Sequence, residues 1–214
     1  QQAAFYREPG FRGFGLPGAE QLQGKELSFN NIGDANAAME LAASFAPPAL
    51  VAVKHANPCG VGIGEDLSAA FDRAYASDPV SIFGGIIAAN RELDGATAAK
   101  LAELFLEVII APSYSPEARV VLEVKKNLRL LRLDFPTPGE QLPAGPELRR
   151  VAGGLLIQDL DRADYRPADL VVKTKQAPSP AELADLALAW KVVKYVKSNA
   201  IVLWRDGGTV GVGA

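Results

Sequence analysis

Residues 49–64 read ALVAVKHANPCGVGIG and join a short apolar run to a glycine-rich segment. The run Ala49–Val53 is uninterrupted, which is typical of a strand buried on both faces of a parallel or mixed sheet. The residues after it, Lys54–Gly64, include Pro58 and several glycines, so we predict a loop where that strand ends. Loops at strand ends of α/β sheets are frequent ligand sites, because a rigid scaffold exposes backbone and side-chain groups there.

Helix and strand patterns alternate on both sides of this stretch. Cap residues and apolar periodicity predict helices that begin near Asp34, Leu67, Ala96, Ser115 and Ser179. Apolar runs predict further strands at 82–89, 108–111 and 129–133, and an Asp-Gly pair predicts a hairpin of 200–204 with 209–212. Residues 1–28 predict an irregular arm with one short strand, and 135–146 a surface connection. The alternation favours an α/β class protein, layered around a parallel or mixed sheet.

The composition is that of an ordinary globular protein. Of the 214 residues, 49% are hydrophobic and 22% are charged, which suffices for a core and argues against intrinsic disorder. No apolar run approaches the roughly 20 residues needed to cross a bilayer, and no signal peptide is evident, so we expect a soluble protein without a membrane partner. The net charge of −3 without a basic block argues against nucleic acid and for a small-molecule partner. A single cysteine fits a cytoplasmic location.

His55 is the only histidine in the chain. Any acid-base chemistry that the chain performs through an imidazole therefore depends on it. The adjacent Lys54 ammonium is expected to disfavour the charged imidazolium and so keep the ring available as a base. The alternative is that His55 only makes structural hydrogen bonds in a loop and that Lys54 is a solvated charge.

Cys59 has two interpretations, as a nucleophile paired with His55 or as a packed, inert thiol. We favour the inert thiol, because nothing in so tight a loop supplies a third, orienting group. One cysteine and one histidine do not make a zinc site, and residues 55–57 lack the glutamate that zinc deaminases use, so we predict no metal site and no zinc. The glycines at 60, 62 and 64 lack the spacing of a dinucleotide-binding loop.

Polar residues and glycines at other strand positions are candidates for the same site. Phe83-Gly84-Gly85 lies within an apolar run, which indicates either a bulge or the close approach of a ligand. Glu107 and Asn199 each precede an apolar run, where they are either ordinary capping residues or part of a ligand site. Together with Lys54 and His55 they would form a cluster of donors and acceptors for a polar heterocycle.

Five blocks of the chain, in order, resemble the AICAR transformylase domain of the PurH family of bifunctional purine biosynthesis proteins. They are QGKELSFNNIGD (23–34), VKHANPCG (53–60), FGG (83–85), EVIIAP (107–112) and KSNA (197–200). The resemblance implies a three-layer α/β/α sandwich with a mixed sheet, of the cytidine-deaminase-like type. It divides the chain into an irregular N-terminal arm (1–30), a first subdomain (31–175), and a linking helix with the first hairpin of a second subdomain (176–214).

The resemblance also implies a reaction. The family transfers a formyl group from 10-formyltetrahydrofolate, a co-substrate, to the 5-amino group of AICAR ribonucleotide. By resemblance, His55 is the base or proton shuttle, Lys54 assists it and stabilises the developing oxyanion, and Asn199 holds the carboxamide and the formyl group. An arylamine conjugated with a carboxamide is a weak nucleophile, so loss of its proton during attack fits a histidine base.

The remaining implied roles concern binding and assembly. Asn31, Phe83, Gly84 and Glu107 match positions that line the AICAR pocket, and Val80 matches the folate side. The resemblance implies a homodimer with sites at its interface, and a structural potassium ion that some members hold. We expect the chain to be a piece of a longer enzyme, without the cyclohydrolase domain, the phosphate-binding arginines or most of the folate site. The rival hypothesis is a non-catalytic nucleotide-binding or dimerisation fragment of that enzyme.

Overall fold

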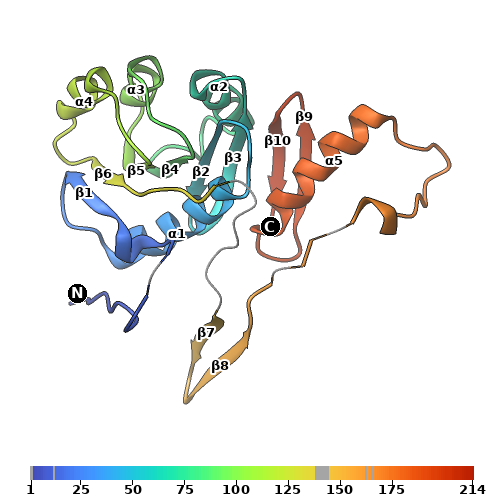
Figure 1. Cartoon of the computed structure of the whole chain (residues 1–214), viewed down its shortest axis with the longest axis horizontal. Coiled ribbons are helices and arrows are strands. Elements are labelled where there is room, and N and C mark those ends of the chain that lie inside the picture. The colour runs from blue at the N-terminus through green and yellow to red at the C-terminus, as the bar shows by residue number, and fades with distance from the viewer. Residues whose placement is uncertain (1, 12, 138–144, 162, 165) are drawn as a thin grey trace.

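The computed structural model describes residues 2–11, 13–137, 145–161, 163, 164 and 166–214, which form helices and strands in alternation (Figure 1). The elements in chain order are η1 (Leu16–Gly18), β1 (Glu20–Gln23), α1 (Phe29–Ala43), β2 (Ala49–Lys54), β3 (Asn57–Ile63), α2 (Leu67–Ser77), β4 (Gly85–Ala89), α3 (Gly95–Ala102), β5 (Leu106–Ala111), α4 (Pro116–Glu123), β6 (Arg129–Arg132), β7 (Pro146–Val151), β8 (Gly154–Asp159), η2 (Pro167–Asp169), α5 (Pro180–Val193), β9 (Ile201–Arg205) and β10 (Gly208–Gly213).

Eight of the strands form one mixed sheet in the order β1-β6-β5-β4-β2-β3-β10-β9. The pairs β4/β5 and β5/β6 are parallel, and the other pairs are antiparallel. Helices α2, α3 and α4 lie on one side of the sheet, and α1 lies on the other (Figure 1). This arrangement confirms the predicted α/β class and the three-layer α/β/α sandwich.

The core has two parts because successive side chains of a strand point to opposite faces of the sheet. In β2, Leu50 and Ala52 pack in the cluster that contains α2, α3 and α4. Val51 and Val53 pack in the cluster that contains α1 and the end of α5. All four residues are fully buried, as the uninterrupted apolar run predicted.

The predicted loop at 54–64 is wrong, because most of it is strand β3. This strand pairs with β2 on one side and with β10 on the other. Its glycines allow α2 to lie close against the sheet: a Cβ atom on Gly60 would collide with the carbonyl oxygen of Ala74, and one on Gly62 with that of Ala70. The glycines therefore serve helix–sheet packing rather than a flexible ligand loop.

The predicted helix start at Asp34 is also wrong, since α1 begins at Phe29. Ser28 is the N-cap, and it forms a reciprocal capping box with Asn31: the Asn31 N–H donates to Ser28 Oγ, and the Ser28 N–H donates to Asn31 Oδ1, both at 3.1 Å. Asparagine replaces the usual glutamate or glutamine of this motif, which hid the signal. Asp34 lies inside the helix.

Strand β4 begins at Gly85, so Phe83 and Gly84 precede it, and the irregularity expected in this segment lies between Gly85 and Ile86, where the register against β5 shifts. Gly84 lies in a turn with φ +68°, a conformation that favours glycine.

Other boundaries agree with the sequence. The short strand expected in 1–28 is β1, α2 spans Leu67–Ser77, and the capping box of Ser179 with Glu182 begins α5. The hairpin around Asp206-Gly207 is confirmed as β9 and β10.

The β7–β8 hairpin was not anticipated, and both its strands are exposed throughout. Residues 138–144 of the predicted surface connection lie outside the described residues. Among the described residues, none of the helices is long and apolar enough to cross a membrane.

Candidate functional site

The predicted site residues lie along one edge of the central sheet. The strand pairs define this edge. Lys54 pairs with Asn57 at the end of β2, and the start of β4 lies beside it. The start of β4 in turn pairs with β5 near Val108, and Val108 pairs with Arg129 at the start of β6. This edge is the carboxyl end of β2 but the amino end of the parallel strands β4, β5 and β6. It therefore brings together segments that are far apart in the chain.

His55 occupies a two-residue turn between β2 and β3. Lys54 pairs with Asn57 across this hairpin, so that His55 and Ala56 form its tip. Their φ angles are +54° and +60°, as a type I′ turn requires at both central positions. Such turns favour Asn-Gly; His is tolerated better than most residues at positive φ, whereas Ala56 is strained there. The turn exposes the only histidine of the chain to solvent.

The turn is tied to the segment before Asn199. The backbone N–H of Lys197 donates to Asn57 Oδ1 at 3.1 Å, and Lys197 Nζ donates to the His55 carbonyl oxygen at 3.5 Å. Asn199 follows two residues later, is exposed, and lies just before β9. The two predicted catalytic segments are therefore adjacent in space, although 140 and 142 residues of chain separate the bonded pairs.

Lys54 contacts the second predicted substrate segment. Its Nζ donates to the Phe83 carbonyl oxygen at 2.8 Å. An ammonium group has three donors, so this bond leaves two of them for other acceptors. A Cβ atom on Gly84 would lie 2.9 Å from the same Nζ, so glycine at this position keeps the lysine end accessible.

An aromatic surface adjoins this lysine. The rings of Phe83 and Phe105 lie 5.1 Å apart, and their side chains are 64% and 53% exposed. Val80, on the same turn, is 83% exposed. Exposed apolar side chains beside a cation suit a flat, polar ring system, because such sites combine apolar walls with a few polar groups.

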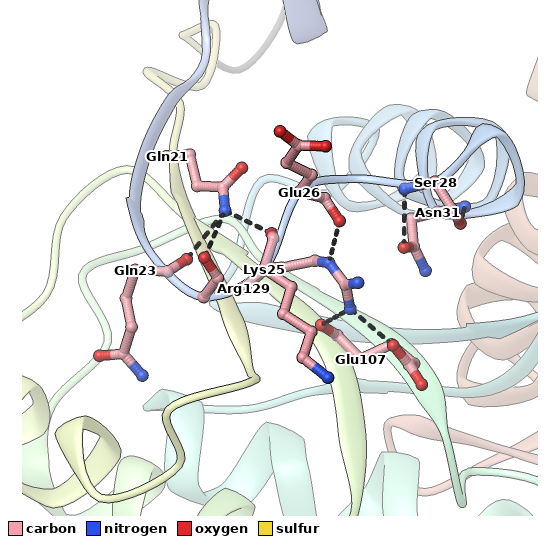
Figure 2. Close-up of polar contacts among 9 residues, drawn as sticks. Gln21, Gln23, Lys25, Glu26, Ser28, Asn31, Glu107 and Arg129 are labelled. Carbon is pink, nitrogen blue, oxygen red and sulfur yellow. Dashed lines mark hydrogen bonds and ion pairs between the residues drawn. The ribbon is translucent and has the colours of Figure 1, made fainter. Parts of the chain in front are cut away.

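Glu107 forms an ion pair with Arg129 rather than with Lys54 or His55 (Figure 2). The Glu107 Oε2 to Arg129 Nη1 distance is 2.6 Å, and the two side chains are 35% and 11% exposed. Arg129 Nε also donates to the Glu26 carbonyl oxygen at 2.9 Å. Arg129 was not among the predicted site residues. Its only local signal was a charge at the start of the strand R-L-L-R, which has a second arginine, Arg132, at its other end.

Asn31 lies at the start of α1, close to the segment that bonds Arg129 (Figure 2). Its Oδ1 is engaged in the capping box with Ser28, and its Nδ2 lies outside that reciprocal pair. The side chain is thus held by the helix cap with an amide donor available at its tip.

Cys59 is a poor nucleophile in this structure. Burial raises the pKa of its thiol to about 11, with a smaller contribution from the charge of Asp78. The Sγ atom lies 3.5 Å from the Ala52 carbonyl oxygen and packs against the core. The packing of Cys59 is confirmed, and a thiol with so high a pKa is protonated at neutral pH; its inertness stays a prediction. Among the described residues, no three His, Cys, Asp or Glu side chains are grouped to hold a metal ion.

A cavity of about 640 Å³ lies elsewhere, between the N-terminal arm, α1 and residues 145–161. Burial raises the pKa of the Glu40 carboxyl and raises the pKa of Tyr195 to about 12. Both residues line this cavity, which shares none of the predicted site residues.

The chain is similar in sequence to one family of known proteins over its whole length. The family model for the AICARFT/IMPCHase bienzyme matches residues 1–214. Proteins described as bifunctional purine biosynthesis protein PurH, from Bacillus cereus (strain G9842) and Bacillus anthracis (strain CDC 684 / NRRL 3495), are 56% identical over 214 residues. The match to PurH of Bacillus thuringiensis (strain Al Hakam) has the same identity. Each match covers 100% of this chain and 41% of the relative, so the chain spans less than half the length of these curated relatives.

Proposed function

Because the chain belongs to the AICARFT/IMPCHase bienzyme family, we propose that it provides the acid-base part of a formyltransferase site in purine biosynthesis. The reaction would move the formyl group of 10-formyltetrahydrofolate to the 5-amino group of AICAR ribonucleotide, giving FAICAR and tetrahydrofolate. The observation that carries the proposal is the exposed His55, presented on a constrained turn beside Lys54.

The reaction needs one group that takes a proton and one that stabilises a negative charge, and these two residues can supply them. The amine nitrogen attacks the formyl carbon and forms the new C–N bond, while His55 takes the proton that this nitrogen loses. The C–N10 bond of the folate then breaks, and the proton goes to the leaving nitrogen. Lys54, with donors left over from its bond to Phe83, stabilises the negative charge that develops on the formyl oxygen.

The neighbouring residues would bind and orient the nucleotide. Asn199 holds the carboxamide and the formyl group, and the Phe83-Gly84 turn supports the flat ring. Glu107, oriented by Arg129, accepts hydrogen bonds from the substrate amine or amide. Asn31 offers its amide group to the same pocket, and Val80 provides an apolar contact on the folate side.

Assembly completes the proposal. Sites of this type would form where two copies of the protein meet, in a cytoplasmic homodimer. Light scattering of the complete gene product tests the dimer: a monomer that transfers formyl groups at the full rate would contradict it.

Replacement of His55 by alanine tests the catalytic assignment in the complete gene product that carries this chain. We expect the formyl-transfer rate to fall by about 10²–10⁴-fold, the usual contribution of a general base, with AICAR binding retained. Cys59→Ala is a matched control in the same hairpin, and its turnover should stay unchanged. An unchanged rate in His55→Ala would refute the proposal, and AICAR binding without any formyl transfer by the parent protein would favour a non-catalytic nucleotide-binding role.

A further inference from the structure

The His55-Ala56 turn requires support from outside its own hairpin. The ladder between β2 and β3 ends at the pair Lys54–Asn57, so the amide groups of the two tip residues lie beyond it. Both residues carry β-carbons, and both have positive φ angles. A turn with an unfavourable alanine and no ladder bonds at its tip does not by itself hold the imidazole in one direction.

Asp34 on α1 supplies the missing contact. Its Oδ1 accepts the N–H of Ala56 at 2.8 Å, across 22 residues of sequence. Helix α1 is anchored at its start by the Ser28–Asn31 capping box, and the neighbouring Ala35 and Ala38 are fully buried against the sheet. The Asp34 carboxylate is therefore held by a helix that packs in the core.

A second anchor reaches the same turn from the opposite end of the chain. Lys197 Nζ donates to the carbonyl oxygen of His55, while Asp34 accepts from the N–H of Ala56. Both contacts hold the same peptide unit, the one that joins His55 to Ala56: Lys197 binds its carbonyl oxygen and Asp34 its N–H. Of the two, the Asp34 bond is the shorter and comes from the buried helix.

We propose that Asp34 is a positioning residue for formyl transfer, which acts by holding the Ala56 N–H and so setting the direction of the His55 imidazole. This inference rests on the proposed function for the reaction that it affects. It assigns Asp34 no contact with substrate. Misplacement of a reacting group by about 1 Å costs on the order of 100-fold in rate, so the single bond has a measurable consequence.

Two substitutions in the complete gene product separate the position of the acceptor from its charge. Asp34→Asn keeps an oxygen at Oδ1 and removes the charge, whereas Asp34→Glu keeps the charge and moves the carboxylate by one methylene. We expect kcat within about threefold of the parent for Asp34→Asn and a fall of about 10- to 100-fold for Asp34→Glu. The KM for AICAR should stay within about threefold in both, since binding groups are untouched.

Asp94→Ala is the matched control, because Asp94 Oδ1 also accepts one backbone N–H, that of Thr97, at 2.7 Å. It should lower thermal stability without a selective fall in kcat. Amide hydrogen exchange at Ala56 gives a readout that does not require activity: exchange should accelerate in Asp34→Glu and stay slow in Asp34→Asn and in the control.

The outcomes distinguish this inference from the proposed function. An Asp34→Glu protein as active as the parent, or an Asp34→Asn protein as impaired as Asp34→Glu, would overturn the positioning role while His55→Ala remains inactive. A rise in KM at unchanged kcat would also overturn it. If His55→Ala keeps its full rate, the proposed function and this inference fail together.

Discussion

Two hairpin turns of the same sheet share a backbone shape but differ in composition. The turn between β9 and β10 is Asp206-Gly207, with φ angles of +52° and +81°, and the turn between β2 and β3 is His55-Ala56, with +54° and +60°. Asp-Gly is a preferred pair for this geometry, whereas an alanine in place of the glycine costs about 1–2 kcal/mol in the left-handed region. The first composition suits the fold, and the second is explained better by what the turn presents to solvent.

The surroundings of the two turns differ accordingly. The Gly207 carbonyl oxygen accepts the N–H of Ile63, a backbone bond between the turn and the end of the neighbouring strand β3. The Ala56 N–H instead donates to the Asp34 side chain on a helix. The unfavourable turn is thus held by a tertiary side-chain contact, and the favourable turn by the sheet itself.

The largest expected effect comes from giving the β2–β3 turn the preferred composition. The double substitution His55→Asn with Ala56→Gly should raise the free energy of unfolding by about 1 kcal/mol, because Asn-Gly adopts the turn with little strain. The formyl-transfer rate should fall by about 10²–10⁴-fold, because the base is lost. Thermal unfolding and initial rates measure the two effects. A destabilised protein would contradict the strain assigned to the His55-Ala56 turn, and a fully active one would contradict the role of His55 as the base.

The converse change in the β9–β10 turn should affect stability alone. Gly207→Ala places a β-carbon at φ +81°, 3.2 Å from the Ile63 carbonyl oxygen, so we expect a loss of about 1–2 kcal/mol in denaturant unfolding. The formyl-transfer rate of the folded protein should stay within about threefold. Gly153→Ala is the matched control: φ is +75° but nothing lies within 4 Å, and its strands β7 and β8 are exposed. Equal losses in both variants would show that the Ile63 contact has no influence.

A smaller effect is expected from Ala56→Gly alone. Removal of the β-carbon relieves strain at φ +60°, which should stabilise the protein by about 0.5–1 kcal/mol. His55 and the N–H that bonds Asp34 both remain, so the rate should stay within about threefold. Urea unfolding with parallel rate assays checks both values, and a destabilised variant would show that Ala56 is not strained.

The smallest effect on rate concerns Cys59, four residues after His55. Its folded-state pKa of about 11 lies above the ordinary value, so the thiol contributes stability that is complete at neutral pH and is lost as pH rises through 11. Alkylation by iodoacetamide at pH 8 should be about 100-fold slower in the folded protein than in the unfolded chain. Rapid folded-state labelling would contradict this, and unchanged turnover in Cys59→Ala would separate Cys59 from the chemistry of the turn.

Local signals predicted much of the fold. Ser179 and Glu182 marked the start of α5, and Asp206-Gly207 marked a hairpin, because caps and turns depend on residues a few positions apart. The start of α1 was missed for a related reason: Asn31 takes the position that the usual capping box gives to Glu or Gln. Strand β3 was missed because its glycines and proline are typical of loops.

The site was predictable in part. The position of His55 beside Lys54 and the segments around Phe83, Glu107 and Asn199 were singled out from the sequence. Strand register places the first three along one edge, and the Lys197–Asn57 bond brings the Asn199 segment to it. Their roles in binding and catalysis stay predictions. Arg129 was not anticipated, since its partner Glu107 lies on a neighbouring parallel strand, 22 residues away.

The amino-acid sequence by itself determined the α/β class, most helix starts and the presence of a single imidazole. The tertiary structure alone decided that Gly60 and Gly62 pack beneath α2, that Arg129 pairs with Glu107, and that Asp34 holds Ala56. The physical reason is distance along the chain. Propensities and caps act within one or two turns of backbone, whereas these contacts exist only once strand register and helix packing bring distant residues together.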